Sequence, residues 1–289
     1  MNLKKRSLYK PYLLLLPVLI VILCLFLGGV LLAVMQSLGY FPLIGLDEIT
    51  FKYYIEVLTE PQFINSLFYS LYVSFTAAIL SVIIGVFLAY QLFKLPHEHL
   101  FLNLFYKLPI IVPHIVVSLI VFLLFTQSGF ISRLFYNIGV IGDMRDFPSM
   151  IFDNRGIGII LAYLWKQVPF VTLITYTLLK NINNQWEQAA KNLGASQFQI
   201  FWNIYLPLIL PGIGSAFIIV FAFSFGAFEI PMLLGPSNPR TLPVLAYQRF
   251  SSVDLLQRPY AMVIMVVVSI ICFILIYFYK KLLNYTVKF

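Results

Sequence analysis

The sequence predicts an all-α membrane protein with six transmembrane helices, and three observations carry that prediction. The 289 residues are 61% hydrophobic and only 10% charged, whereas a soluble domain would carry about a quarter charged residues. The mean hydropathy is +0.93. The apolar residues gather in runs near the length of about 20 residues that a helix needs to cross a bilayer. Membrane-spanning strands would be shorter and would alternate in polarity.

Six apolar runs are expected to form the spans. They lie at approximately 12–36, 66–92, 108–126, 156–179, 208–234 and 259–279. The first follows the basic segment MNLKKRSLYK, is longer than the apolar part of a signal peptide and has no small-residue cleavage site after it, so we expect a retained signal anchor. Cys24 and Cys272 lie inside such runs, so neither a disulfide nor a metal site is expected.

The distribution of charge predicts that both termini are cytoplasmic. In that orientation the cytoplasmic side holds 11 Lys and Arg residues against two acidic residues, and the other side holds seven basic and eight acidic residues. Cytoplasmic loops of membrane proteins carry such an excess of Lys and Arg. Topology therefore explains the net charge of +8, and lipid rather than nucleic acid is the expected surrounding partner.

The loops are expected to be long outside and shorter inside. The outer loops lie at 37–65, 127–155 and 235–258, and the first of them should contain a short interfacial helix. The inner segment 93–107 has the composition of an ordinary polar turn. We find no internal repeat and no soluble domain, so one transmembrane domain is expected over 1–289. Its core lies at about 65–280, after an N-terminal span and first outer loop at 1–64.

A polar helical hairpin is predicted at 184–207, between the fourth and fifth spans and therefore in the cytoplasm. Asn184 and Glu187 have the spacing of a capping box, which predicts a helix that begins at Gln185. This helix should stop at Gly194, a residue type suited to the left-handed conformation after a helix end. A polar helix is unusual in so apolar a chain, and we therefore expect it to have a function.

The second helix of the hairpin is predicted from a repeat of the same signal. Ser196 and Gln199 have capping-box spacing, and the helix should end at Pro207. Its aromatic residues, which should anchor it at the membrane interface, are Phe198, Phe201, Trp202 and Tyr205. It contains no Arg or Lys, which argues against a DNA-binding helix-turn-helix. A plain amphipathic connector is the remaining alternative.

The hairpin resembles the cytoplasmic loop of ABC-importer permeases, which carries the pattern E-A-A-x3-G-x9-I-x-L-P. The residues that match are Gln188, Ala189, Ala190, Gly194, Ile204, Leu206 and Pro207. Gln188 stands where the family has Glu, although Glu187 precedes it, and Leu193 stands where Asp is frequent. The two alanines give the first helix a face without bulk, which another protein can approach closely. The resemblance extends over about 65–280.

This resemblance implies a transmembrane subunit of a type I, binding-protein-dependent ABC importer in a prokaryotic cell membrane. In that family the hairpin is the coupling helix, which docks on a separate cytoplasmic ATPase dimer. The residues implied in this coupling are Glu187, Gln188, Ala189, Ala190, Gly194, Ala195, Ile204, Leu206 and Pro207. The chain has no G-x-x-x-x-G-K-[ST], so ATP and Mg²⁺ are expected on the ATPase, and no cofactor or enzymatic activity on this chain. A second, different permease subunit and an external solute-binding protein are the other implied partners.

The sequence does not identify the substrate. The segment FEIPMLLGPSNPRTLPVLAY resembles the polyamine-type (spermidine/putrescine) permeases. That group is itself similar to the ferric-iron, phosphonate and oxyanion importers. The alternative from another class is a stand-alone channel or secondary transporter, against which the sparse charge inside the spans argues. A membrane enzyme is disfavoured because the sequence has no His and Cys set with metal-ligand spacing and no nucleophile with a base.

Three ionisable residues inside the predicted spans are candidates for the substrate path, because a charge in a bilayer is costly. They are His114, Lys166 and Glu229. His114 can instead be a neutral histidine bonded to a carbonyl that Pro113 frees, and Lys166 can snorkel or pair within the bundle. Glu229, near the outer end of the fifth span beside Pro231, suits a gate or an interfacial salt bridge. A cationic substrate favours Glu229 and an anionic one Lys166.

Overall fold

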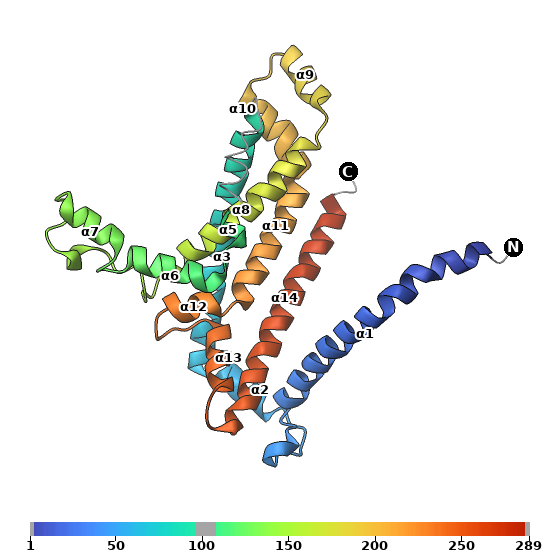
Figure 1. Ribbon diagram of the computed structural model, residues 1–289, viewed down its shortest axis with the longest axis vertical. Helices are drawn as coiled ribbons and strands as arrows, with labels where there is room; N and C mark the ends of the chain where they lie inside the picture. Colours follow the sequence, from blue (N-terminus) through green and yellow to red (C-terminus); the bar gives the residue numbers. More distant parts are fainter. Residues whose placement is uncertain (1–2, 96–107, 287–289) are drawn as a thin grey trace. The chain divides into compact units, whose positions relative to one another are not determined.

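The computed structural model describes residues 3–95 and 108–286, and within them the fold is helical, without β-strands (Figure 1). Six helical segments are long and apolar enough to cross a membrane. They are Tyr12–Ser37, Pro61–Lys94, His114–Asn137, Ile157–Lys180, Gln197–Gly226 and Leu255–Lys281. The all-α class and the six spans predicted from the sequence are thereby confirmed.

The described residues divide into two compact units. The first comprises the residues up to Glu60 together with Ala246–Val267. The second comprises Pro61–Leu245 together with the residues from Val268 onward. Helices α13 (Leu242–Phe250) and α14 (Arg258–Thr286) each contribute residues to both units.

The first unit is built on the N-terminal span. Its elements are α1 (Leu3–Ser37), η1 (Pro42–Ile44), α2 (Lys52–Thr59) and η4 (Leu255–Gln257), with parts of α13 and α14. Helix α2 confirms the short helix predicted in the segment 37–65. The hydroxyls of Ser37 and Tyr54 lie 2.8 Å apart and join the end of α1 to α2, while Glu60 and Arg249 form an ion pair.

Three long helices form the core of the second unit. They are α3 (Pro61–Lys94), α8 (Ile157–Lys180) and α11 (Leu206–Gly226), and each packs on the other two. At Gly85 the backbone of α3 comes so close to α8 that an added Cβ would lie 2.8 Å from the Val171 side chain. Small residues permit such close helix packing within membranes.

A buried polar cluster joins the same three helices. The Gln167 side chain on α8 accepts a hydrogen bond from the Ser81 hydroxyl on α3 at 3.1 Å. Its amide donates to the Val220 carbonyl on α11 at 3.3 Å and to the Ser224 hydroxyl. Because an unpaired polar group is costly in hydrocarbon, these bonds favour one register of α3, α8 and α11.

Two predicted spans are interrupted. The run at 108–126 divides into α5 (Leu108–Ile111) and α6 (His114–Phe125), because Pro113 lacks a donor and pushes the preceding residue out of helical geometry. The run at 208–234 ends at Gly226, and its last residues form a separate helix, α12 (Glu229–Leu234). Both breaks lie near the ionisable residues singled out from the sequence.

Two of the segments predicted as long loops contain short helices. The segment 127–155 holds α7 (Phe130–Asn137) and η2 (Met144–Asp146), and the segment 235–258 holds α13 and η4. The polar turn predicted at 93–107 falls mostly on residues 96–107, which lie outside the described residues.

Candidate functional site

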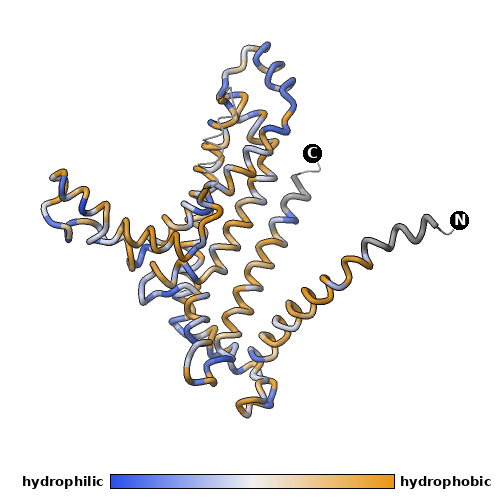
Figure 2. The backbone as a smooth tube through the Cα atoms, viewed as in Figure 1, coloured by the Kyte–Doolittle hydropathy of each residue, from blue (hydrophilic) through white to orange (hydrophobic). Residues whose placement is uncertain are grey.

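The first half of the candidate hairpin is α9 (Asn184–Asn192), a hydrophilic segment at one end of the apolar α8 and α11 in Figure 2. Asn183 caps the helix, since its side-chain oxygen accepts the Gln185 N–H at 3.0 Å. The helix thus begins one residue before the predicted start, and Glu187 does not complete a capping box. Residues 183 and 184 are both asparagine, so the cap pattern alone could not choose between them.

The turn after α9 has the predicted left-handed glycine. Gly194 has a φ of +81°, its N–H donates to the Lys191 carbonyl at 2.9 Å, and the Ala195 N–H donates to the Ala190 carbonyl at 3.0 Å. This pair of bonds is the Schellman arrangement. No heavy atom lies within 4 Å of the position of an added Cβ, so backbone conformation alone explains the need for glycine at 194.

The second half begins as predicted and continues further. Ser196 and Gln199 form both capping-box bonds, at 3.3 and 2.8 Å, at the start of α10 (Gln197–Ile200). The prediction that this helix ends at Pro207 is wrong. A π-helical segment, η3 (Phe201–Tyr205), leads directly into α11, so the helix continues through Pro207, the second residue of α11.

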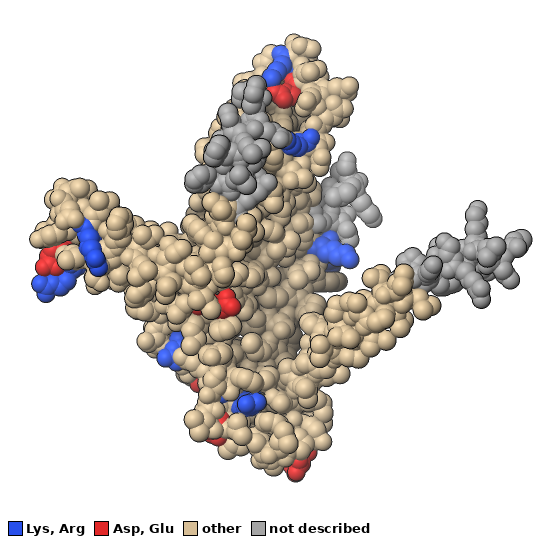
Figure 3. All heavy atoms as spheres, in the orientation of Figure 1, with Lys and Arg blue, Asp and Glu red and all other residues tan. Residues whose placement is uncertain are grey.

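The motif residues of the hairpin fall on two sides. Four pack against the hydrophobic cluster around Ile200, Tyr205 and Ile209; they are Ala190, Ala195, Ile204 and Leu206. Those exposed are Gln188, Ala189, Gly194 and Pro207. The expectation that Ala189 and Ala190 share one open face is therefore wrong, because α9 turns Ala190 toward its own chain. In Figure 3, basic and acidic atoms lie at the α9 end and are sparse over the long helices.

Glu187 links α9 to the helix that follows. The Tyr205 hydroxyl donates to its carboxylate at 2.5 Å, and Lys191 forms an ion pair with it at 2.6 Å. The bond to Lys191, followed by the bond to Tyr205, lowers the pKa of Glu187 below its ordinary value of 4.5. A lowered carboxyl pKa stabilises the fold above the ordinary value, and this contribution is lost as the pH falls through the lowered pKa. The link is thus fully formed at neutral pH.

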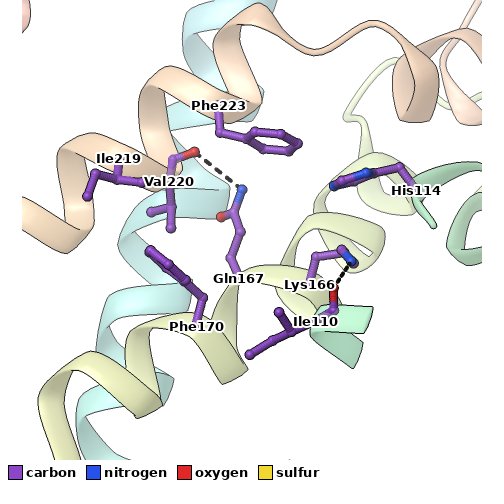
Figure 4. A pocket seen from close by; sticks show the side chains of 8 residues that line it. All are labelled: Ile110, His114, Lys166, Gln167, Phe170, Ile219, Val220 and Phe223. Atoms are coloured by element: carbon purple, nitrogen blue, oxygen red, sulfur yellow. Dashed lines mark hydrogen bonds between the residues drawn. The ribbon is translucent and has the colours of Figure 1, made fainter. Parts of the chain in front are cut away.

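Two of the three predicted path residues, His114 and Lys166, line a cavity of about 230 Å³ between α5, α6, α8 and α11 (Figure 4). The residues that line it are Ile110, His114, Lys166, Gln167, Phe170, Ile219, Val220 and Phe223. His114 and Lys166 come from different helices and far-apart positions in the sequence, and the fold brings both to this cavity. The mostly apolar lining carries a few polar groups, as is usual for small-molecule sites.

Lys166 is bound by backbone carbonyls where the helix is interrupted between α5 and α6. Its ammonium donates to the carbonyls of Pro109, Ile110 and Val112 at 2.8, 3.1 and 2.7 Å, and Figure 4 draws the bond to Ile110. Carbonyls at the end of α5 have no partner within the helix, and Pro113 supplies no donor. All three ammonium protons are therefore used by the backbone, and Lys166 pairs within the bundle.

His114 and Glu229 lie on another side of the same region. The imidazole packs on the Phe223 ring with centroids 4.9 Å apart, and its Nδ1 lies 3.8 Å from the Glu229 carboxylate. That contact is an ion pair only when the imidazole is protonated. Glu229 is the first residue of α12, just after the break at Gly226, and its side chain is 42% exposed.

Sequence reasoning missed Gln167 and the role of Tyr205. The signal for Gln167 was available, since an amide directly after Lys166 inside an apolar run needs hydrogen-bond partners. Tyr205 was assigned to the membrane interface, whereas its ring is 3% exposed and its hydroxyl reaches Glu187.

Replacing Lys166 by methionine is expected to destabilise the second unit by about 2 kcal/mol, because three intramembrane hydrogen bonds of about 0.6 kcal/mol each are lost. Thermal unfolding of the purified chain in detergent measures the effect. Lys52→Met is the control, since Lys52 is largely exposed and makes only an i,i+4 pair with Glu56 at 3.8 Å. Equal stability of the two variants would contradict the capping role of Lys166.

A family model described as binding-protein-dependent transport system inner membrane component matches residues 81–288. The chain belongs to this family. It is a permease subunit of a type I ABC importer and a multi-pass protein of a prokaryotic inner membrane, in agreement with its six apolar helices.

Relatives of the permease differ in the solute that their names give. It is 30% identical over 196 residues to the molybdenum transport system permease protein ModB of Escherichia coli K12, covering 66% of this chain and 81% of ModB. It is 29% identical over 184 residues to the spermidine/putrescine transport system permease protein PotB of the same strain, covering 62% of this chain and 63% of PotB.

Solved structures share the permease fold. A chain from the crystal structure of a bacterial alginate ABC transporter, in complex with an alginate pentasaccharide-bound periplasmic protein, superposes with a TM-score of 0.76 at 17% identity. The match covers 96% of the permease and 94% of that chain. The fold expected from the hairpin motif is therefore the fold observed.

Proposed function

We propose that this permease pairs with a second, different permease subunit to form the path for a small cationic solute of the polyamine class. An external binding protein delivers the solute. A separate ATPase dimer, which holds ATP and Mg²⁺, docks on the 184–207 hairpin and drives the conformational change. The observation that carries the choice of charge is that Lys166 is engaged by backbone carbonyls while the Glu229 carboxylate is partly exposed beside the cavity.

The hydrogen bonds of Lys166 and the exposure of the Glu229 carboxylate favour a cation over an anion. Lys166 would have to give up three carbonyl bonds before its ammonium could bind an anion, and those carbonyls would then lack donors. Glu229 has His114 at 3.8 Å, and this neighbour neutralises it only when protonated. An approaching ammonium group can therefore pair with Glu229 without displacing a fixed positive charge.

The aromatic lining favours the same class of solute. Phe170 and Phe223 line the cavity, and aromatic faces attract ammonium groups more strongly when water is excluded. Ile110, Ile219 and Val220 add aliphatic surface, which suits the methylene segments between the amino groups of a polyamine. A phosphate-like or molybdate-like oxyanion would instead need several free donors.

The hairpin supports docking of an ATPase from the cytoplasm. An excess of Lys and Arg on one side predicts that both termini and this hairpin are cytoplasmic. Gln188 and Ala189 are exposed on α9, beside Trp186 and Leu193, which are 63% and 88% exposed. Gln188 and Ala189 on this surface occupy positions of the coupling motif that the hairpin resembles. Other residues of the motif, such as Ala190, pack against the hydrophobic cluster around Ile200 and Tyr205 and so position this surface.

An oxyanion importer is the second candidate, because ModB is a relative of similar identity. The deciding experiment is uptake by proteoliposomes that contain the permease pair, its ATPase and its binding protein. We expect ATP-dependent accumulation of labelled spermidine or putrescine and none of molybdate or sulfate. Accumulation of an oxyanion would overturn the choice of solute, and uptake without the ATPase would overturn the docking role.

A further inference from the structure

The hairpin is joined to the fifth span by a side-chain bond as well as by the chain. The Tyr205 hydroxyl, at the end of η3, donates to the Glu187 carboxylate on α9 at 2.5 Å. The two residues are 18 positions apart in sequence and lie on opposite arms of the hairpin. Lys191 pairs with the same carboxylate at 2.6 Å and keeps it in its charged form. A hydrogen bond to a charged acceptor is stronger than one between neutral groups.

Tyr205 is itself fixed in the core of the second unit. Its ring packs edge-on against Phe93 and Tyr90 of α3, with centroids 5.5 and 6.2 Å apart, and only 3% of the residue is exposed. Tyr205 therefore holds Glu187 from a position that belongs to the packed helices.

The π-helical segment decides where this hydroxyl points. In η3 the Leu206 N–H bonds back to the Phe201 carbonyl, five residues earlier, so the segment holds one residue more than an α-helical turn would. One added residue rotates the following side chains by about 100° around the helix axis. Single π turns of this kind are frequent at functional sites. Here the π segment ends at the tyrosine that holds α9.

We propose that the bond between Tyr205 and Glu187 is the positioning contact by which a displacement of α9 is passed to α11. The inference rests on the proposed docking of an ATPase at the hairpin. Without this bond, the arms stay joined by the turn at 193–196 and by the apolar packing of Ala190 and Ala195. Apolar packing has little directional preference, so α9 can then tilt without moving α11.

The test uses the complete complex of permease pair, ATPase and binding protein in proteoliposomes, and measures solute transported per ATP hydrolysed. Tyr205→Phe keeps the ring and removes the hydroxyl, and we expect the ratio to fall on the order of tenfold. Tyr90→Phe is the matched control, since the Tyr90 hydroxyl makes only a 3.4 Å contact with the Gln197 carbonyl of the same cluster. Its ratio should stay near wild type.

Variants of the acceptor separate positioning from general stability. Glu187→Gln keeps an oxygen that accepts from Tyr205 and should retain most of the ratio, whereas Glu187→Ala should match Tyr205→Phe. The double variant should be no worse than either single variant, because both remove the same bond. A Tyr205→Phe ratio equal to that of Tyr90→Phe would overturn the inference. Failure of the wild-type permease to retain the ATPase on purification would instead overturn the proposed docking.

Discussion

Replacing Gly194 by valine is expected to abolish the coupling of ATP hydrolysis to transport while the permease still inserts and pairs. The φ of +81° at this position costs a β-branched residue on the order of 1–2 kcal/mol, and the turn relaxes by changing the angle between α9 and α10. The surface proposed to meet the ATPase is thereby misdirected. ATP-driven uptake in proteoliposomes and retention of the ATPase on the purified complex measure the effect.

Two variants make this result specific. Gly139→Val places the same residue type at a φ of +74° in the turn after α7, also with no atom within 4 Å of the added Cβ. It should leave coupling unchanged. Gly194→Asn should restore much of the coupling, because asparagine tolerates the left-handed region better than valine does. If Gly194→Val couples as well as Gly139→Val, the hairpin is only a connector between spans.

Glu229→Gln is expected to reduce uptake of a polyamine by about ten- to a hundredfold, since a hydrogen-bonded charge contact contributes roughly 1.5–3 kcal/mol. The substitution keeps the size of the side chain at the start of α12 and removes its charge. The concentration dependence of uptake, together with basal ATPase activity of the complex, separates lost recognition from lost assembly. Basal ATPase activity should stay near wild type.

The control for this effect is a carboxylate of comparable exposure outside the cavity. Asp143→Asn removes a charge that is paired with Arg145 at 3.1 Å at the start of η2. Arg145 holds the pKa of Asp143 below its ordinary value, so the control also removes a real negative charge. Uptake should be unaffected by Asp143→Asn. Equal uptake by the Glu229→Gln variant and the wild type at all polyamine concentrations would remove Glu229 from the path.

The sequence was sufficient wherever the deciding interactions are local. The spans follow from apolar run length, and the Ser196 cap and the Gly194 turn follow from bonds between residues a few positions apart. The start of α9 was displaced by one residue because two neighbouring asparagines offer the same cap. The continuation of α10 into α11 could not be predicted, because a proline usually ends a helix and Pro207 here directly follows a π segment.

The rest depended on contacts that sequence spacing does not encode. Lys166 is capped by carbonyls more than fifty positions earlier, so its partners appear only when α5 lies against α8. The orientation of Ala190 could not be predicted, because the cluster that it packs against combines residues of α3, α8, α10, η3 and α11. The bond between Glu187 and Tyr205 depends on a π turn, which no sequence pattern indicates.

One continuous helical segment, Gln197–Gly226, contains both Tyr205 of the hairpin contact and the α11 residues that line the cavity. At about 1.5 Å per residue, Tyr205 lies about 9 Å and Phe223 about 18 Å along the helix from Pro211, on opposite sides of it. This helical segment is held at Pro211, whose carbonyl accepts hydrogen bonds from the Ser215 and Tyr279 hydroxyls at 3.0 and 2.5 Å. A displacement of the hairpin end about Pro211 would therefore be about doubled at the cavity wall.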